Sequence, residues 1–133
     1  MFFRCHRCRS LSLSPDNLTK QQREALRLKY SGRCAYCGCE LGQRWAADHI
    51  EPLVRDWVNG GCQYPERDCF ENLAPACMSC NTIKGSLSLE SFRKVIGGFI
   101  TSLNRDSTQY KFAKRYGLIQ ENEVEVKFYF ETI

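Results

Sequence analysis

Two pairs of cysteines bracket a short stretch that contains an acidic residue and a histidine. The first pair is Cys34 and Cys37, and the second is Cys77 and Cys80. Two C-x2-C pairs on either side of an insert have the spacing of a four-thiolate zinc site, which is closed and leaves no position for water or substrate. A redox-active pair is the alternative, but two pairs around one insert favour a metal. The sequence therefore predicts a structural Zn²⁺ that joins two distant segments.

The insert places a carboxylate next to an imidazole. Asp48 and His49 are adjacent, and two amides follow at Asn72 and Asn81. A carboxylate and an amide oxygen form a hard ligand set that suits Mg²⁺ or Mn²⁺, and histidine can take a proton from water near neutral pH. Because neighbouring strand residues point to opposite faces, Asp48 and His49 can flank one site only where the strand ends, which Pro52 favours. These groups indicate metal-assisted attack on a phosphodiester.

The order of these residues resembles that of the HNH endonucleases. The resemblance covers about residues 32–86 and is carried by Cys34-x2-Cys37, Asp48-His49-Ile50-x-Pro52, Gly60-Gly61, Asn72-Leu73 and Cys77-x2-Cys80-Asn81-x2-Lys84-Gly85. It implies a ββα-metal (His-Me finger) core, in which two strands and a helix surround one catalytic cation. It also implies an endonuclease that hydrolyses phosphodiester bonds of DNA, with double-stranded DNA as the expected partner.

The same resemblance implies a role for each polar residue of the insert. His49 is the implied general base, and Asp48 is an implied ligand of the catalytic cation. Asn72 matches the middle asparagine of the family, which braces the loop and helps to orient the base. Asn81 stands where many members have histidine and is the implied second ligand of the cation. An amide there makes the site harder and favours Mg²⁺ or Mn²⁺ over Ni²⁺ or Zn²⁺.

Basic residues near the insert are the candidate substrate contacts. We assign Arg33, Arg44 and Lys84 to the phosphate backbone, although a solvated charge fits Lys84 equally well. Residues 1–47 carry nine Lys or Arg against three acidic residues, whereas residues 48–133 carry ten against twelve. A basic N-terminal third suits a phosphate binder, but a solvated helix face gives the same count. The competing function is therefore a non-catalytic zinc-ribbon protein that binds nucleic acid through this basic third.

The remaining cysteines and the composition bear on the setting of the protein. The chain has 133 residues and nine cysteines, an odd number that fits a closed disulfide framework poorly. The N-terminus does not read as a signal peptide, and no stretch approaches the ~20 apolar residues of a membrane span. We expect a cytoplasmic protein with no membrane partner, for which monomer and homodimer both fit. Cys5 and Cys8 form a third pair, which indicates a second zinc site or reduced thiols on a loose arm.

Periodicity and turn residues predict the elements around the insert. Helices are expected over residues 18–30, from 79 or 80 to 85, 89–105 and 107–116, with a break or close contact at Gly97-Gly98, and strands over 44–50 and 124–130. Trp45 and Trp57 are expected to be core or rim aromatics. The predicted fold class is α+β. A zinc-stapled core over 32–86 follows a basic arm and helix over 1–31, and C-terminal helices with a closing strand cover 87–133. This last part resembles small phage and bacterial HNH proteins more weakly.

Overall fold

The computed structural model describes residues 17–133 of the chain, which form a small antiparallel sheet and several helices. The elements are α1 (Lys20–Leu28), β1 (Trp45–His49), β2 (Leu73–Cys77), α2 (Met78–Lys84), α3 (Leu89–Gly97), α4 (Phe99–Asp106) and α5 (Thr108–Arg115), with 3-10 turns at Pro65–Arg67, Phe70–Asn72 and Tyr129–Glu131. This mixture confirms the predicted α+β class, and β1, β2 and α2 form a ββα unit. Within the described part of the chain, no helix is long and apolar enough to cross a membrane.

The register of the sheet places a cysteine and the Asp-His pair at opposite ends of the two strands. β1 and β2 run antiparallel, with Trp45 opposite Cys77 and His49 opposite Leu73. One further backbone bond, from Ile50 N to Asn72 O at 2.9 Å, follows the last pair. β1 ends at His49, as the sequence predicts from the nearby proline. The cysteine thus lies at one end of the sheet and the Asp-His pair at the other.

Helix α1 fastens the sheet through its basic side chains. It begins after Thr19, whose hydroxyl accepts a hydrogen bond from Gln22 N while the Gln22 side chain accepts one from Thr19 N, a capping box. Three side chains of the helix and its end then donate to backbone carbonyls of the core: Arg23 to Trp45 O at 2.9 Å, Arg27 to Leu41 O and Gly42 O at 3.0 Å, and Lys29 to Leu73 O at 2.8 Å. Burial lowers the pKa of the Lys29 amine. These bonds satisfy carbonyls that would otherwise need water.

An aromatic cluster closes the core on the other side. Phe128 is fully buried and stacks on Phe92 with ring centroids 5.2 Å apart, while Tyr36 meets both rings edge-on at 5.4 Å. Arg93 holds the C-terminal segment in place, because its guanidinium donates to Val126 O at 2.7 Å and pairs with a glutamate that follows Phe128. Phe128 and the partly buried Phe130, near the C-terminus, therefore belong to the core.

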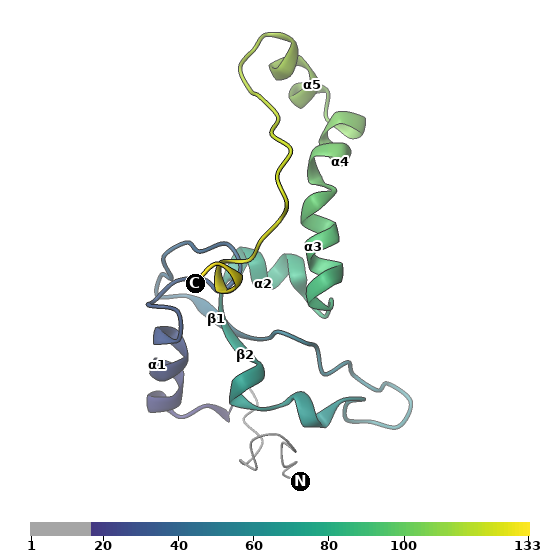
Figure 1. Ribbon diagram of the computed structural model, residues 1–133. Coiled ribbons are helices and arrows are strands. Elements are labelled where there is room, and N and C mark those ends of the chain that lie inside the picture. The colour runs from purple at the N-terminus through teal and green to yellow at the C-terminus, as the bar shows by residue number, and fades with distance from the viewer. Residues whose placement is uncertain (1–16) are drawn as a thin grey trace.

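Helices α3, α4 and α5 extend away from the sheet as a row, and the segment after α5 runs back to the core (Figure 1). Gly97-Gly98 separates α3 from α4, which confirms the predicted break. The predicted closing strand over 124–130 is wrong, since these residues form no strand and end in a 3-10 turn. Their apolar pattern reflects the burial of Phe128 and the partial burial of Phe130 against the core. Their backbone instead donates hydrogen bonds to the loop of the first cysteine pair, from Tyr129 N to Tyr36 O and from Phe130 N to Ala35 O, each at 3.0 Å.

Candidate active site and metal centre

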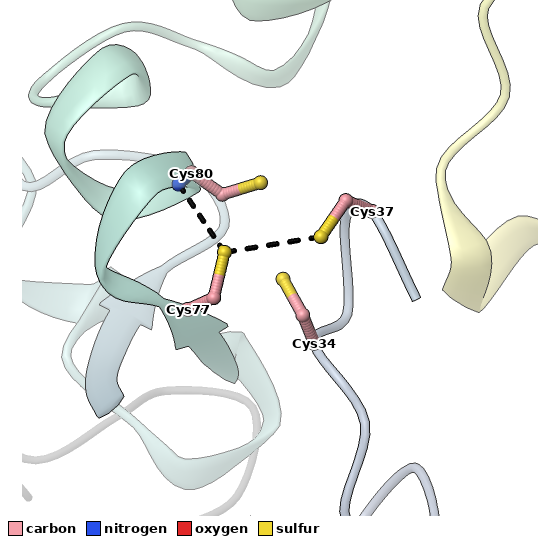
Figure 2. A group of neighbouring side chains, drawn as sticks. All are labelled: Cys34, Cys37, Cys77 and Cys80. Atoms are coloured by element: carbon pink, nitrogen blue, oxygen red, sulfur yellow. Dashed lines mark hydrogen bonds between the residues drawn. The ribbon is translucent and has the colours of Figure 1, made fainter. Parts of the chain in front are cut away.

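Four cysteine sulfurs converge between a loop and the start of α2. Cys34 and Cys37 come from the loop, Cys77 from the end of β2 and Cys80 from the first turn of α2 (Figure 2). The four sulfur atoms all lie within 4.8 Å of one another, and the Sγ atoms of Cys37 and Cys77 are 3.8 Å apart. Tetrahedral Zn–S bonds of about 2.3 Å place sulfurs about 3.8 Å apart. The cluster therefore fits one metal ion such as zinc.

The crowded thiols shift one another's pKa. The hydrogen bond between Cys34 and Cys80 lowers the pKa of Cys34 to about 4 and raises the pKa of Cys80. Burial raises the pKa of Cys37. One thiolate is thus favoured at the expense of its neighbours, and a divalent cation is the kind of group that allows all four sulfurs to carry charge. Cys5 and Cys8 lie outside the described residues, so the second zinc site stays a prediction.

Asp48 lies in a buried polar cluster near the end of β1. The Tyr36 hydroxyl donates to Asp48 Oδ2 over 2.5 Å, and Lys84 Nζ lies 3.1 Å from the same oxygen. Burial, with the Asp48 charge as a further cause, raises the pKa of Tyr36, so the phenol stays a neutral donor. Within residues 17–133 no hydrogen bond reaches Asp48 Oδ1. One carboxylate oxygen is thus anchored, and the other is the atom that can face a cation.

Lys84 is buried, whereas the sequence predicts an accessible side chain. Its side chain is 1% exposed, and its ammonium also donates to His49 O at 2.8 Å. A phosphate contact and a solvated charge both require an accessible amine, so neither interpretation describes this residue. Lys84 instead neutralises Asp48 and ties α2 to the end of β1. A lysine in the last turn of a short helix gives no sign in the sequence that it turns inward.

His49 forms a hydrogen-bonded pair with Asp68, an acidic residue that no motif in the sequence marks. Its Nε2 lies 3.0 Å from Asp68 Oδ1, and both side chains are largely buried. When an ionised Asp68 accepts from Nε2–H, Nδ1 is the nitrogen that keeps a lone pair. Asp68 lies 19 positions from His49, directly after the 3-10 turn Pro65–Arg67. The two residues come together only because the loop between them folds back, so their separation in the sequence does not predict the contact.

Asn72 fixes the backbone next to both members of this pair. Its Nδ2 donates to Glu51 O and to Arg67 O, each at 2.8 Å, and its Oδ1 accepts from Glu51 N at 3.0 Å. Glu51 follows His49 by two residues, and Arg67 directly precedes Asp68. One amide therefore holds together the two segments that carry the imidazole and its carboxylate.

A cavity of about 450 Å³ opens beside Asp48 and His49. Its lining comes from β1, from the following loop and from the turn after α2, and consists of Ala47, Asp48, His49, Pro52, Leu53, Val54, Arg55, Gly61, Cys62, Gly85 and Ser86. Asn81 is not part of this lining. It lies on α2 three residues before Lys84, which places it on the same side of the helix as the lysine that pairs with Asp48.

The other two predicted substrate contacts lie away from the cavity. Arg33 is exposed, and its guanidinium donates to Gly38 O at 2.9 Å in the loop of the first cysteine pair. Arg44 is exposed directly before β1, at the end of the sheet opposite His49. Neither residue lines the cavity, whereas Arg55, which no motif in the sequence marks, does.

The ββα unit, its four-cysteine cluster and the Asp-His pair where β1 ends define a class of metal-organised ββα proteins. Residues 34–87 match the model of the HNH endonuclease family. The match confirms the resemblance found over residues 32–86, and it supports a nuclease-type function that acts on nucleic acid. No curated protein and no solved structure matches the chain.

Proposed function

We propose that this protein is a metal-dependent DNA endonuclease that hydrolyses phosphodiester bonds, with His49 as its general base. The observation that carries the proposal is the shared cavity wall, in which His49 and Asp48 lie side by side. One is held by Asp68, and the other by Lys84 and Tyr36. Both reactive groups are thus fixed by residues from other elements before any substrate arrives, which lowers the cost of orienting them.

The paired imidazole suits proton abstraction. Asp68 accepts from Nε2 and so leaves Nδ1 of His49 to take a proton from the attacking water. A carboxylate bonded to the opposite nitrogen also stabilises the imidazolium that forms, as in other carboxylate–histidine pairs. Asn72 keeps the two segments in register through its three backbone bonds. The substrate that fits such a base beside a cation site is a phosphodiester.

Asp48 and Asn81 are the residues that would hold the catalytic Mg²⁺ or Mn²⁺. The donor set fits, because Oδ1 of Asp48 has no hydrogen bond within the described residues and an amide oxygen completes a hard pair of ligands. When bound, such a cation offsets negative charge on the scissile phosphate. Lys84 holds Oδ2 and thereby fixes the orientation of Oδ1. The four-thiolate zinc site has no open coordination position, so it stabilises the fold and takes no part in catalysis.

A plasmid assay tests the proposal. Zinc-loaded protein is incubated with supercoiled double-stranded DNA in buffer with Mg²⁺ or Mn²⁺ and in buffer with neither, since a strong chelator would also strip the cysteine site. His49→Ala runs beside Gln43→Ala, an exposed residue outside the cavity. Zinc content is measured for every protein.

We expect relaxed or linear DNA only with added cation, equal amounts from Gln43→Ala, and none from His49→Ala at unchanged zinc content. If the wild-type protein binds DNA and cuts none with either cation, the catalytic proposal is wrong. The zinc-ribbon binding protein then becomes the better description.

A further inference from the structure

The loop between β1 and the first 3-10 turn is an ordered finger formed by residues 53–64, which projects from the sheet (Figure 1). Its two sides are joined by backbone hydrogen bonds from Tyr64 N to Leu53 O at 3.1 Å and from Gln63 N to Val54 O at 2.8 Å. Arg55 and Cys62 then pair as an antiparallel bridge. The finger therefore has the pairing of a short hairpin.

The turn at the end of the finger is fixed by one carboxylate. Oδ1 of Asp56 accepts from Val58 N and Asn59 N, each at 3.0 Å, and its Oδ2 accepts from Asn59 Nδ2 at 3.1 Å. These hydrogen bonds lower the pKa of Asp56, which stays ionised. Gly60 and Gly61 complete the turn with φ of 79° and 75°, a region that favours glycine. The Asp56 side chain and the two glycines thus determine the shape of the tip.

This rigid tip carries two apolar side chains into solvent. Trp57 is 84% exposed and Val58 is 92% exposed, so Trp57 is not a core aromatic. The Arg55 guanidinium lies 5.9 Å from the centre of the Trp57 ring. An ordered tip with a bare indole and an adjacent cation has the chemistry of a nucleic-acid contact, in which the cation meets phosphate and the ring meets bases.

The finger also forms one wall of the cavity that holds His49. Val54, Arg55, Gly61 and Cys62 all line it. A strand whose phosphate enters the cavity must therefore pass the root of the finger. Its neighbouring bases would then lie within reach of the tip.

We infer that the finger is a DNA-distorting wedge, in which Trp57 and Val58 press between base pairs of duplex DNA while Arg55 contacts the phosphate backbone. Apolar side chains used in this way unstack a base step and bend the duplex. The inference rests on the proposed function for the identity of the substrate. It adds that the enzyme distorts the DNA next to the bond that it cuts.

The test uses the full-length zinc-loaded protein and a duplex that carries 2-aminopurine, in buffer without Mg²⁺ or Mn²⁺, so that binding and unstacking are read without cleavage. Trp57→Ala and Val58→Ala are compared with Tyr116→Ala, an aromatic that is 77% exposed after α5 and away from the cavity. We expect the wild-type protein and Tyr116→Ala to raise the 2-aminopurine fluorescence. Trp57→Ala should bind about tenfold more weakly and give little signal. Arg55→Gln should lower the slope of log Kobs against log salt by about one.

Equal binding and equal fluorescence for Trp57→Ala and Tyr116→Ala would overturn the wedge, even if the wild-type protein cuts plasmid DNA. Weaker binding by Trp57→Ala together with no cleavage by the wild-type protein would support the wedge and refute the nuclease. A wild-type protein that does not bind the duplex refutes both.

Discussion

Replacing Lys84 with methionine separates a structural lysine from a substrate contact. Methionine is about as long and fills most of the same space, so the change removes the ammonium with little loss of packing. The ammonium is 3.1 Å from Asp48 Oδ2 and 2.8 Å from His49 O, in a site where the lysine is 1% and Asp48 8% exposed. Removing one partner of a buried ion pair leaves the other charge uncompensated and costs about 3–5 kcal/mol.

Urea unfolding of zinc-loaded protein measures this loss. With an m value of about 2 kcal/mol/M, Lys84→Met should lower the midpoint by about 2 M. Lys94→Met is the matched control, because Lys94 is exposed on α3 and surface substitutions usually change the free energy of unfolding by less than about 0.5 kcal/mol. If the two variants unfold together and only Lys84→Met loses affinity for DNA, the lysine is a phosphate contact and the reasoning is wrong.

The same variant reports on the cation site. Without Lys84, a divalent cation becomes the counter-charge nearest to Asp48, so Mn²⁺ should raise the urea midpoint of Lys84→Met more than that of the wild-type protein. The double variant Asp48→Asn/Lys84→Met removes both charges and should recover part of the lost stability, because neither charge is left buried alone. A double variant that is as unstable as the sum of the single variants would show that the pair is not coupled.

Three further predictions follow from the described contacts. Asp68→Asn should lower kcat by about 10- to 100-fold with little change in KM, because the amide no longer holds His49 in one tautomer; Asp68→Glu should recover part of it, and a change in KM alone would contradict the role. Cys77→Ser should lose zinc and unfold the ββα unit together, since metal binding and folding are coupled; metal analysis and circular dichroism check this, and one zinc per folded chain would refute it. Phe128→Ala should cost about 3–5 kcal/mol in urea unfolding, whereas Phe112→Ala, which is 46% exposed, should cost far less.

The parts of the site that the sequence predicts are those with a local spacing. The two cysteine pairs are recognisable in the sequence because each pair spans one turn. The cluster of four sulfurs in space follows from these two pairs. Asp48 and His49 are recognisable because Pro52 marks the end of the strand that carries them. The break at Gly97-Gly98 is also local, since two glycines weaken a helix wherever they occur.

The parts that the sequence does not predict depend on segments that meet only in the folded chain. His49 and Asp68 are joined by a loop whose path is set by the three bonds of Asn72, so their spacing carries no signal. Lys84 is buried because Tyr36 and Asp48, from two other segments, supply its surroundings. The alternating pattern after residue 123 predicts a strand, but one-sided burial of an irregular segment produces the same alternation.

The charge distribution illustrates how far a count of residues can mislead. The basic N-terminal third suggested a surface for phosphates, yet Arg23, Arg27 and Lys29 donate to carbonyls of the core. Part of the donor capacity of each side chain is therefore used within the protein, whereas the N–H groups that an arginine has left can still reach a phosphate. The number of basic residues in this third therefore overstates the number of cations that have no role in the fold. The exposed cation that lines the cavity is Arg55, so the proposed function has its phosphate contact next to His49 and not on α1.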